Sequence, residues 1–302
     1  MSSRLRRSLV LATMLALLLG VPSAAALVPR GPTPTDSVAR IDIDAMTIPE
    51  LQELMDSGGL SSVQLTTFYF LRILQLNPTL HAVIKVSPTA FTEALAADRA
   101  RRNGDDRPLL GIPIIVKDNI NTTGMPTTAG SWALARNTPD DAFIVERLKA
   151  AGALVIGKAN LSEWANFRSI PSSSGWSGIG GQTNMAYVLD RNACGSSSGS
   201  AVVVSADLAV AAVGTETDGS IVCPAGANAN VGIKPTLGLL SREGIVPISA
   251  NQDTAGPMAR NVTDAAVLLG AMTGIDRNDP ATAAQAGHAF RNYRQFLDAG
   301  AL

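Results

Sequence analysis

Two short runs of branched apolar residues, separated by a helical stretch, constrain the fold of this chain more than any other feature. Residues 112–116 are Ile-Pro-Ile-Ile-Val, and residues 154–156 are Leu-Val-Ile. Such runs are typical of strands buried on both faces, as in sheets covered by helices. Between them, residues 140–152 place apolar side chains at helical spacing and end in glycine. This alternation of strand, helix and strand predicts an α/β fold.

Further elements are predicted on either side of these runs. The sequence Thr47-Ile-Pro-Glu50 has the spacing of a capping box and starts a short helix that ends near Met55. A second helix is expected from Ser61 to Leu76, because Pro78 follows. The other expected elements are helices over 88–102, 200–213 and 262–272, a strand over 231–233, and a loop over 172–181.

The N-terminal residues predict export. Arginines near the start are followed by a short apolar run and then by small residues up to Ala26. This order is typical of a secretory signal peptide, here residues 1–26. The apolar run is short for a bilayer span, so a retained anchor is the less favoured alternative. Residues 27–40 contain three prolines and predict a linker before a domain over 41–302. We therefore expect a periplasmic or secreted protein without stable membrane association.

Composition argues against two classes of partner. Charged residues make up 16% of the chain and the formal net charge is −1, whereas nucleic-acid binding needs an excess of Lys and Arg. The cysteines are Cys194 and Cys223 and the histidines are His81 and His288, with no CxxC pair among them. A structural zinc site needs a denser group of such ligands. We expect no nucleic-acid partner, no metal and no cofactor.

A glycine- and serine-rich segment over residues 195–200 is the first candidate for chemistry. Gly195-x-Ser197-x-Gly199 has the spacing of the nucleophile elbow of α/β-hydrolases, which needs a downstream acid and histidine. Only His288 follows it, within a segment that has no motif. A phosphate-binding loop would need a lysine after the glycines, and none is present. A plain flexible loop is the third interpretation.

With histidine scarce, a lysine is the alternative base for a serine nucleophile. Residues 214–224 surround a Gly-Ser step with Thr and Asp, which suits a tight turn that presents backbone N–H groups. Lys117 directly follows the apolar run at 112–116. Burial there would lower its pKa from about 10.4 and leave a neutral amine able to accept a proton. At a solvated strand end, the same lysine would stay charged.

Several motifs, in order, resemble the amidase signature family over about residues 45–275. They are Gly111-Ile-Pro-Ile-Ile-Val-Lys117-Asp-Asn, Gly157-Lys-Ala-Asn-Leu-Ser-Glu163, Cys194-Gly-Ser-Ser-Ser-Gly-Ser-Ala201, Asp218-Gly-Ser220-Ile and Val231-Gly-Ile-Lys-Pro-Thr236. Within the family, residues 216–224 and 249–258 are most similar to bacterial peptide amidases. The resemblance implies a mixed β-sheet core with helices on both faces.

The resemblance also implies a Ser–Ser–Lys hydrolase without a cofactor. Lys117 matches the family's lysine, Ser196 the bridging serine in a cis peptide, and Ser220 the nucleophile. The implied reaction cleaves a carboxamide C–N bond of a small molecule or a peptide amide, and releases ammonia through a serine acyl-enzyme. The backbone N–H groups implied to stabilise the oxyanion are those of Thr217, Asp218, Gly219 and Ser220.

This sequence departs from the family pattern in ways that leave alternatives open. Glu216 and Asp218 stand where much of the family has Asp and Gly. Relatives continue further at the C-terminus, so the fold is expected to be truncated there, and an impaired fragment is one alternative. The amidase-type subunit of a tRNA-dependent amidotransferase is another, although the export signal argues against it. Cys194 and Cys223 flank the site, and we expect unbonded thiols rather than a disulfide.

Overall fold

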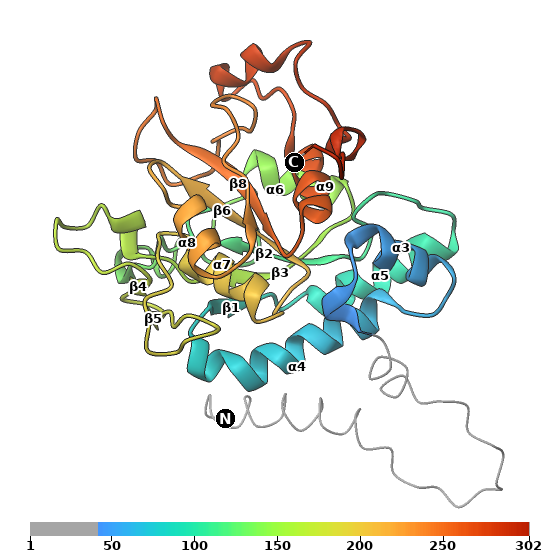
Figure 1. Cartoon of the computed structure of the whole chain (residues 1–302), viewed down its shortest axis with the longest axis horizontal. Coiled ribbons are helices and arrows are strands. Elements are labelled where there is room, and N and C mark those ends of the chain that lie inside the picture. The colour runs from blue at the N-terminus through green and yellow to red at the C-terminus, as the bar shows by residue number, and fades with distance from the viewer. Residues whose placement is uncertain (1–41, 302) are drawn as a thin grey trace, which may run out of the picture. The chain divides into compact units, whose positions relative to one another are not determined.

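A mixed six-stranded sheet with strand order β1-β3-β2-β6-β8-β7 forms the centre of the fold (Figure 1). Strand β2 pairs in parallel with β3 and β6, and all other neighbours in this sheet pair antiparallel. The strands are β1 Val83–Val86, β2 Pro113–Lys117, β3 Leu154–Ala159, β6 Ala211–Glu216, β7 Val231–Gly232 and β8 Thr254–Ala259. A small hairpin of β4 Trp176–Ser177 and β5 Gly181–Gln182 overlaps the expected loop at 172–181 and extends one residue beyond it. The α/β prediction is confirmed.

The structure is a computed structural model that describes residues 42–301. The predicted signal peptide at 1–26 and the predicted linker at 27–40 lie outside the described residues. Within 42–301, no helix has the length and apolar character needed to cross a membrane.

Helices lie on both faces of the sheet, because two crossovers run in opposite directions along it. The chain passes from β2 through α6 (Phe143–Ala150) to β3, and from β3 through α7 (Ser198–Ser205) back across β2 to β6. Right-handed crossovers in opposite directions place α6 and α7 on opposite faces. Helix α9 (Val262–Met272) packs against β8 and α6. The remaining helices are α3 Ile48–Asp56, α4 Ser62–Leu80, α5 Ala90–Arg102, α8 Val222–Ala227 and the 3₁₀ turns η1 Ile43–Ala45, η2 Trp132–Leu134, η3 Glu163–Asn166, η4 Pro280–Gln285 and η5 Tyr293–Phe296.

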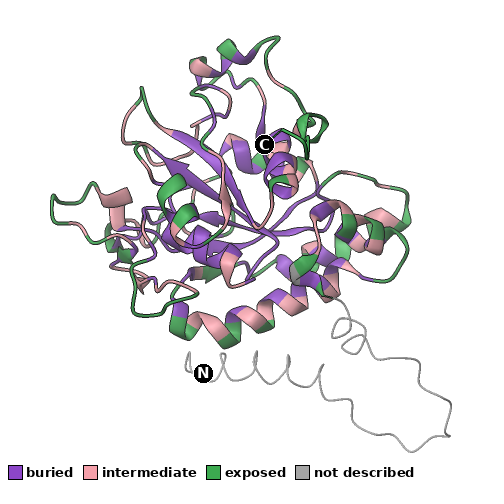
Figure 2. Ribbon diagram, in the orientation of Figure 1, coloured by how far each residue is buried: buried purple, intermediate pink, exposed green. Residues whose placement is uncertain are grey.

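Side-chain caps mark the starts of three of the seven α-helices in the described residues. Thr47 and Glu50 form the expected capping box of α3, and Ser61 and Gln64 form another at the start of α4. Asn261 caps α9, since its side chain accepts the N–H of Asp264. Figure 2 shows the central strands as the most completely buried part of the fold, whereas α4 exposes one side along its length.

Two predicted helix boundaries are wrong, those at the C-terminal ends of the helices expected over 61–76 and 200–213. Helix α4 continues through Pro78 to Leu80 and ends where His81 adopts a left-handed conformation with φ 51°. A proline in the last turn removes only one helical hydrogen bond. Asn77 fixes the chain just beyond the helix, because its side chain donates to the carbonyl of Val83 at 2.9 Å and accepts the N–H of Val83 at 2.8 Å.

The segment predicted as one helix over 200–213 is instead helix α7 followed by strand β6. Both parts are buried and apolar, and periodicity alone does not separate a buried helix from a buried strand. The break lies at Asp207, which has φ 53° and forms ion pairs with Arg72 and Arg260. Strands β1 and β8 were not predicted. Strand β8 contains Gly256 and Pro257, which disfavour a strand prediction.

Candidate active site

Lys117 ends strand β2 at the centre of the sheet, and its side chain is fully buried. Its Nζ lies 2.8 Å from Ser196 Oγ, 2.8 Å from Thr215 Oγ1 and 3.3 Å from the Thr215 carbonyl oxygen. Desolvation by burial lowers the pKa of Lys117 from 10.5 to about 7, while the charges of Glu216 and Asp253 act in the opposite direction. A large fraction of this lysine is therefore neutral near pH 7.

Ser196 precedes helix α7, on the loop that faces the end of β2. The peptide bond between Gly195 and Ser196 is cis, as the resemblance implies, and Ser196 is fully buried. The N–H of the next residue, Ser197, donates to the carbonyl of Ser220 at 3.1 Å. Lys117 and Ser196 thus meet across 79 positions of sequence, and the backbone of Ser220 is bonded to the residue that follows Ser196.

Ser197, the serine of the nucleophile-elbow alternative, has another role. Its Oγ donates to the Thr215 carbonyl at 3.0 Å and lies 3.2 Å from the Thr215 N–H, which donates to it. The hydroxyl therefore ties the start of α7 to strand β6. His81 ends α4 and His288 follows η4, and within residues 42–301 neither is bonded to Ser197. The geometry does not support the elbow.

Ser220 lies in the tight turn between β6 and α8, and the carboxylate of Glu216 organises that turn. Glu216 Oε1 accepts the N–H of Gly219 at 3.0 Å, and its Oε2 accepts those of Ile221 at 2.7 Å and Val222 at 2.9 Å. Gly219 has φ 75°, a conformation that favours glycine. The turn leaves Ser220 8% exposed, so it is nearly enclosed yet reachable.

The expected set of four oxyanion donors needs one correction. The N–H of Gly219 is already bound to Glu216. In the described part of the chain, the backbone N–H groups of Thr217, Asp218 and Ser220 bond to no other group of the protein. The side chain of Thr217 fixes the position of this residue, since its Oγ1 donates to Asp253 at 2.6 Å. Three of the four expected donors remain available in this turn.

Thr215 and Asn119 join the site without having been singled out among the sequence-based candidates. Thr215 Oγ1 receives hydrogen bonds from Lys117 and from Asn119 Nδ2, the latter at 3.0 Å. Asn119 lies inside a quoted motif, two positions after Lys117, and Thr215 lies in the segment 214–224, on the strand before the Gly-Ser turn. Their closeness in sequence to Lys117 and to the Gly-Ser turn could have pointed to them. Their contact with each other, however, depends on the pairing of β2 with β6.

Cys194 and Cys223 form a disulfide with their Cα atoms 6.0 Å apart, so the expectation of unbonded thiols is wrong. The bridge joins the residue before Gly195 to the first turn of α8, just after Ser220. The hydrogen bond between Ser197 and Ser220 brings the same two segments together. The bridge therefore connects the loops that bear the two candidate serines.

A cavity of about 290 Å³ opens beside Thr215 and Thr217. Its other walls come from residues 242–254 and 278–280. A smaller cavity of about 140 Å³ shares Asn119 and residues 246–248 with it. The aromatic side chains of Trp164 and Phe167 line this second space, so the two cavities together offer a polar and an apolar side.

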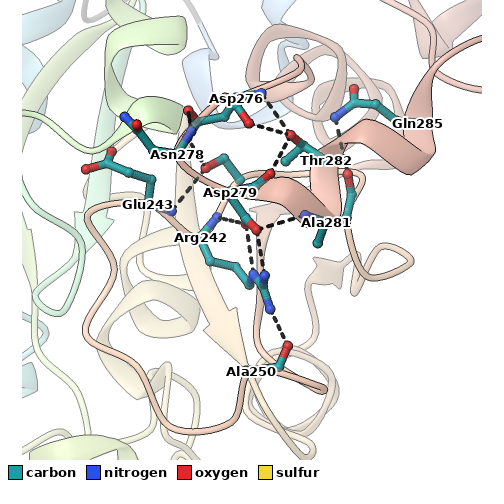
Figure 3. Close-up of polar contacts among 11 residues, drawn as sticks. Arg242, Glu243, Ala250, Asp276, Asn278, Asp279, Ala281, Thr282 and Gln285 are labelled. Carbon is teal, nitrogen blue, oxygen red and sulfur yellow. Dashed lines mark hydrogen bonds and ion pairs between the residues drawn. The ribbon is translucent and has the colours of Figure 1, made fainter.

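Arg242 holds the outer wall of the larger cavity in place (Figure 3). Its Nε and Nη2 donate to the carboxylate of Asp279 at 2.8 and 2.6 Å, and its Nη1 donates to the carbonyl of Ala250. Asp279 in turn begins η4, where it accepts the N–H of Ala281. The pairing joins two segments of the wall that are distant in sequence, and it lowers the pKa of Asp279.

A second lysine, Lys158 on β3, is also fully buried. It lies 3.7 Å from Asp118 Oδ1, and its Nζ donates to Thr127 Oγ1 at 2.9 Å and to the carbonyl of Ile120. Burial lowers its pKa to about 8 against the opposing charge of Asp118. Asp118 follows Lys117 directly, so this pair anchors the backbone that leaves β2.

Comparison with known proteins decides the family. The amidase family model matches residues 64–297. The chain belongs to the amidase family. A probable amidase of Arabidopsis thaliana is 46% identical over 266 residues, which cover 86% of this chain and 52% of that protein. A glutamyl-tRNA(Gln) amidotransferase subunit of Symbiobacterium thermophilum is 43% identical over 245 residues, covering 80% of this chain and 49% of that protein.

Solved amidase structures share the fold. A peptide amidase from Stenotrophomonas maltophilia matches with a TM-score of 0.83 and 56% identity, over 84% of this chain and 53% of that one. An amidase family protein from Bacillus anthracis matches with a TM-score of 0.82 and 45% identity, over 85% of this chain and 52% of that one. This amidase chain thus spans about half the length of the curated relatives and structures that it matches.

Proposed function

We propose that this amidase is an amidohydrolase, which cleaves a carboxamide C–N bond and releases ammonia through an acyl-enzyme on Ser220. One observation supports the proposal above the others. Lys117 is fully buried, its pKa is lowered to about 7, and its Nζ lies 2.8 Å from Ser196 Oγ. A base with a pKa near the working pH is the most efficient proton acceptor.

The contacts of Lys117 suggest how a neutral amine acts there. A neutral amine has two N–H donors and one lone pair. Thr215 offers two acceptors, its Oγ1 at 2.8 Å and its carbonyl at 3.3 Å. With both N–H groups directed to Thr215, the lone pair is left to accept the proton of Ser196, whose Oγ is 2.8 Å away. Asn119 steadies the Thr215 hydroxyl from the other side.

The proposed reaction proceeds in two halves. Ser220 Oγ attacks the amide carbon while its proton passes to Ser196, and the proton of Ser196 passes to Lys117. The C–N bond breaks as the relay returns a proton to the leaving nitrogen, which departs as ammonia. Water then attacks the acyl-enzyme through the same relay and releases the carboxylic acid. The N–H groups of Thr217, Asp218 and Ser220 are the donors proposed for the oxyanion, a contribution of about 3–4 kcal/mol per donor in hydrolases.

The finer proposal for the substrate is a peptide with a C-terminal amide. The supporting observation is the 56% identity to a peptide amidase over 84% of this chain. The cavity beside Thr217 and the adjoining apolar space lined by Trp164 and Phe167 provide room for an acyl group with a side chain. Export to an oxidising compartment is also proposed. The disulfide between Cys194 and Cys223 supports it, because such bonds persist mainly outside the cytosol.

Labelling and turnover together test the proposal. A fluorophosphonate that acylates activated serines should label Ser220, as shown by peptide mass spectrometry. Ser220→Ala should abolish the label, whereas Ser197→Ala should keep it. Ammonia release would be measured with peptide amides, free amino-acid amides and simple aliphatic amides. Label on Ser197, or label that survives Ser220→Ala, would refute the assignment.

The amidotransferase alternative predicts a different pattern. An isolated subunit of that type would release ammonia from glutamine and would not discriminate among peptide amides. This alternative is tested because the chain is 43% identical to one subunit of a glutamyl-tRNA(Gln) amidotransferase. Preference for glutamine over every peptide amide would favour the amidotransferase alternative.

A further inference from the structure

A third and larger cavity lies away from the Lys117 site, and residues of helices α3, α5, α6 and α9, which Figure 1 labels, line it. Its volume is about 700 Å³, within the range of small-molecule sites. None of the residues that line it lines the two cavities beside Thr215. Any ligand bound there would not touch Lys117, Ser196 or Ser220.

Arginines dominate the charge of this cavity, hereafter the arginine cavity. Its lining includes two acidic residues, Asp56 and Asp106, and five basic ones: Arg101, Arg107, Arg147, Arg291 and Arg294. Two of the arginines already serve the fold. Arg101 pairs with Asp56, and Arg107 pairs with Asp105 outside the cavity.

The other three arginines have no polar partner for their side chains in the described part of the chain. Within residues 42–301, the side chains of Arg147, Arg291 and Arg294 make no hydrogen bond or ion pair. Arg147 is the most constrained of them, because its Nε is enclosed and no acceptor of the described chain reaches it. The buried Nε holds the side chain in place, so an anion in the cavity would pair with the terminal Nη1 and Nη2 groups, which have no partner in the described chain.

Close backbone packing holds these arginines around the cavity. A Cβ at Gly270 of α9 would lie 2.2 Å from the carbonyl oxygen of Arg291, so glycine allows the segment after η4 to lie against the helix. Tyr293, in η5 on the same segment, packs against the core. Arg147 of α6 packs its Nε over Gly274, just beyond α9, where a Cβ would lie 3.3 Å away. Helix α6 and the segment after η4 therefore both contribute unpaired guanidinium groups to the cavity.

We propose that the arginine cavity binds a small anion that carries two phosphate groups. Guanidinium groups bind phosphate oxygens through paired N–H donors, and three unpaired guanidinium groups from two segments of the lining suit a ligand with two anionic groups. The remaining lining is largely apolar, with Ile48, Pro108 and Val267, and this surface would contact an organic portion of the ligand. The site is separate from the proposed hydrolytic centre and does not depend on it.

Direct binding measurements test this proposal on the full chain. The probes are inorganic pyrophosphate and a nucleoside diphosphate, titrated by calorimetry at constant ionic strength. Both should bind and should raise the Tm more than sodium chloride does at the same ionic strength. If the nucleoside diphosphate binds more tightly than pyrophosphate, the apolar part of the lining contacts the organic portion of the ligand. If the two bind equally, the ligand is a free diphosphate.

Substitutions distinguish specific binding in the arginine cavity from nonspecific electrostatic attraction of the anion. Arg147→Gln should weaken pyrophosphate binding at least tenfold, while Arg136→Gln, an exposed arginine outside the cavity, should leave it unchanged. Asp106→Asn removes an exposed carboxylate from the lining and should tighten binding severalfold. If Arg147→Gln does not fold, the double variant Arg291→Gln and Arg294→Gln should show the same loss, since both side chains are exposed. Equal loss in Arg136→Gln, or no change in Asp106→Asn, would overturn the proposal.

Discussion

Replacing Lys117 by methionine should stabilise the protein at low pH and progressively less as the pH rises. The wild-type lysine is fully buried and its pKa falls from 10.5 in the unfolded chain to about 7 in the fold. Between these values the unfolded chain binds a proton that the folded chain does not. The free energy of unfolding of the wild type therefore rises with pH across this window. Below pH 7 the lysine destabilises the fold to its full extent.

The size of this effect follows from the two pKa values. A shift from 10.5 to about 7 corresponds to about 5 kcal/mol of destabilisation at pH 6, and about 2 kcal/mol remains at pH 9. Methionine removes that destabilisation but also removes the hydrogen bonds to Thr215 and Ser196, at a cost of about 1–3 kcal/mol. Thr215 Oγ1 keeps its bond from Asn119, which limits the loss. We expect Lys117→Met to be more stable by about 2–4 kcal/mol at pH 6 and to have little advantage at pH 9.

Urea unfolding at pH 6, 7.5 and 9 measures this difference, with intrinsic fluorescence as the signal. Wild type and variant share every other titrating group. The pH dependence of the difference between their free energies of unfolding therefore reports on Lys117 alone. Lys85→Met is the matched control, since Lys85 is exposed on β1 and its replacement should give a difference that does not change with pH. A Lys117→Met difference that stays flat within about 1 kcal/mol from pH 6 to 9, or that grows with pH, would refute a neutral buried lysine.

Other substitutions probe the rest of the site. Lys158→Met should destabilise by about 3–5 kcal/mol at pH 7, opposite in sign to Lys117→Met, because the buried carboxylate of Asp118 loses its cation and keeps hydrogen bonds from Thr128. Urea unfolding measures the change, and a stabilised variant would contradict the pairing. Replacing both Cys194 and Cys223 by alanine should lower the free energy of unfolding by about 3–4 kcal/mol for a closed loop of this length, and an unchanged urea midpoint would mean that the bridge does not form in solution. Ser197→Ala should cost about 1–3 kcal/mol, since the buried N–H that it accepts becomes unpaired; a neutral effect would argue against its role as an anchor.

The features that sequence alone determined are those that depend on neighbours along the chain. The capping boxes at Thr47 and Ser61 place helix starts, because a cap acts within three positions. The apolar runs at 112–116 and 154–156 become β2 and β3, since strands buried on both faces need uninterrupted apolar residues. The order of the motifs indicated the family, and it located Lys117 at the end of a buried strand.

Features that depend on contacts between distant segments were decided by the tertiary structure. Thr215 reaches Lys117 only because β6 pairs with β2, across 98 positions of sequence. The pairing of Cys194 with Cys223 depends on the turn that Glu216 organises, and the same carboxylate removes the N–H of Gly219 from the oxyanion donors. No local pattern specifies these partners. Each depends on which buried groups the packed sheet brings into contact, and leaving a buried polar group without a partner costs free energy.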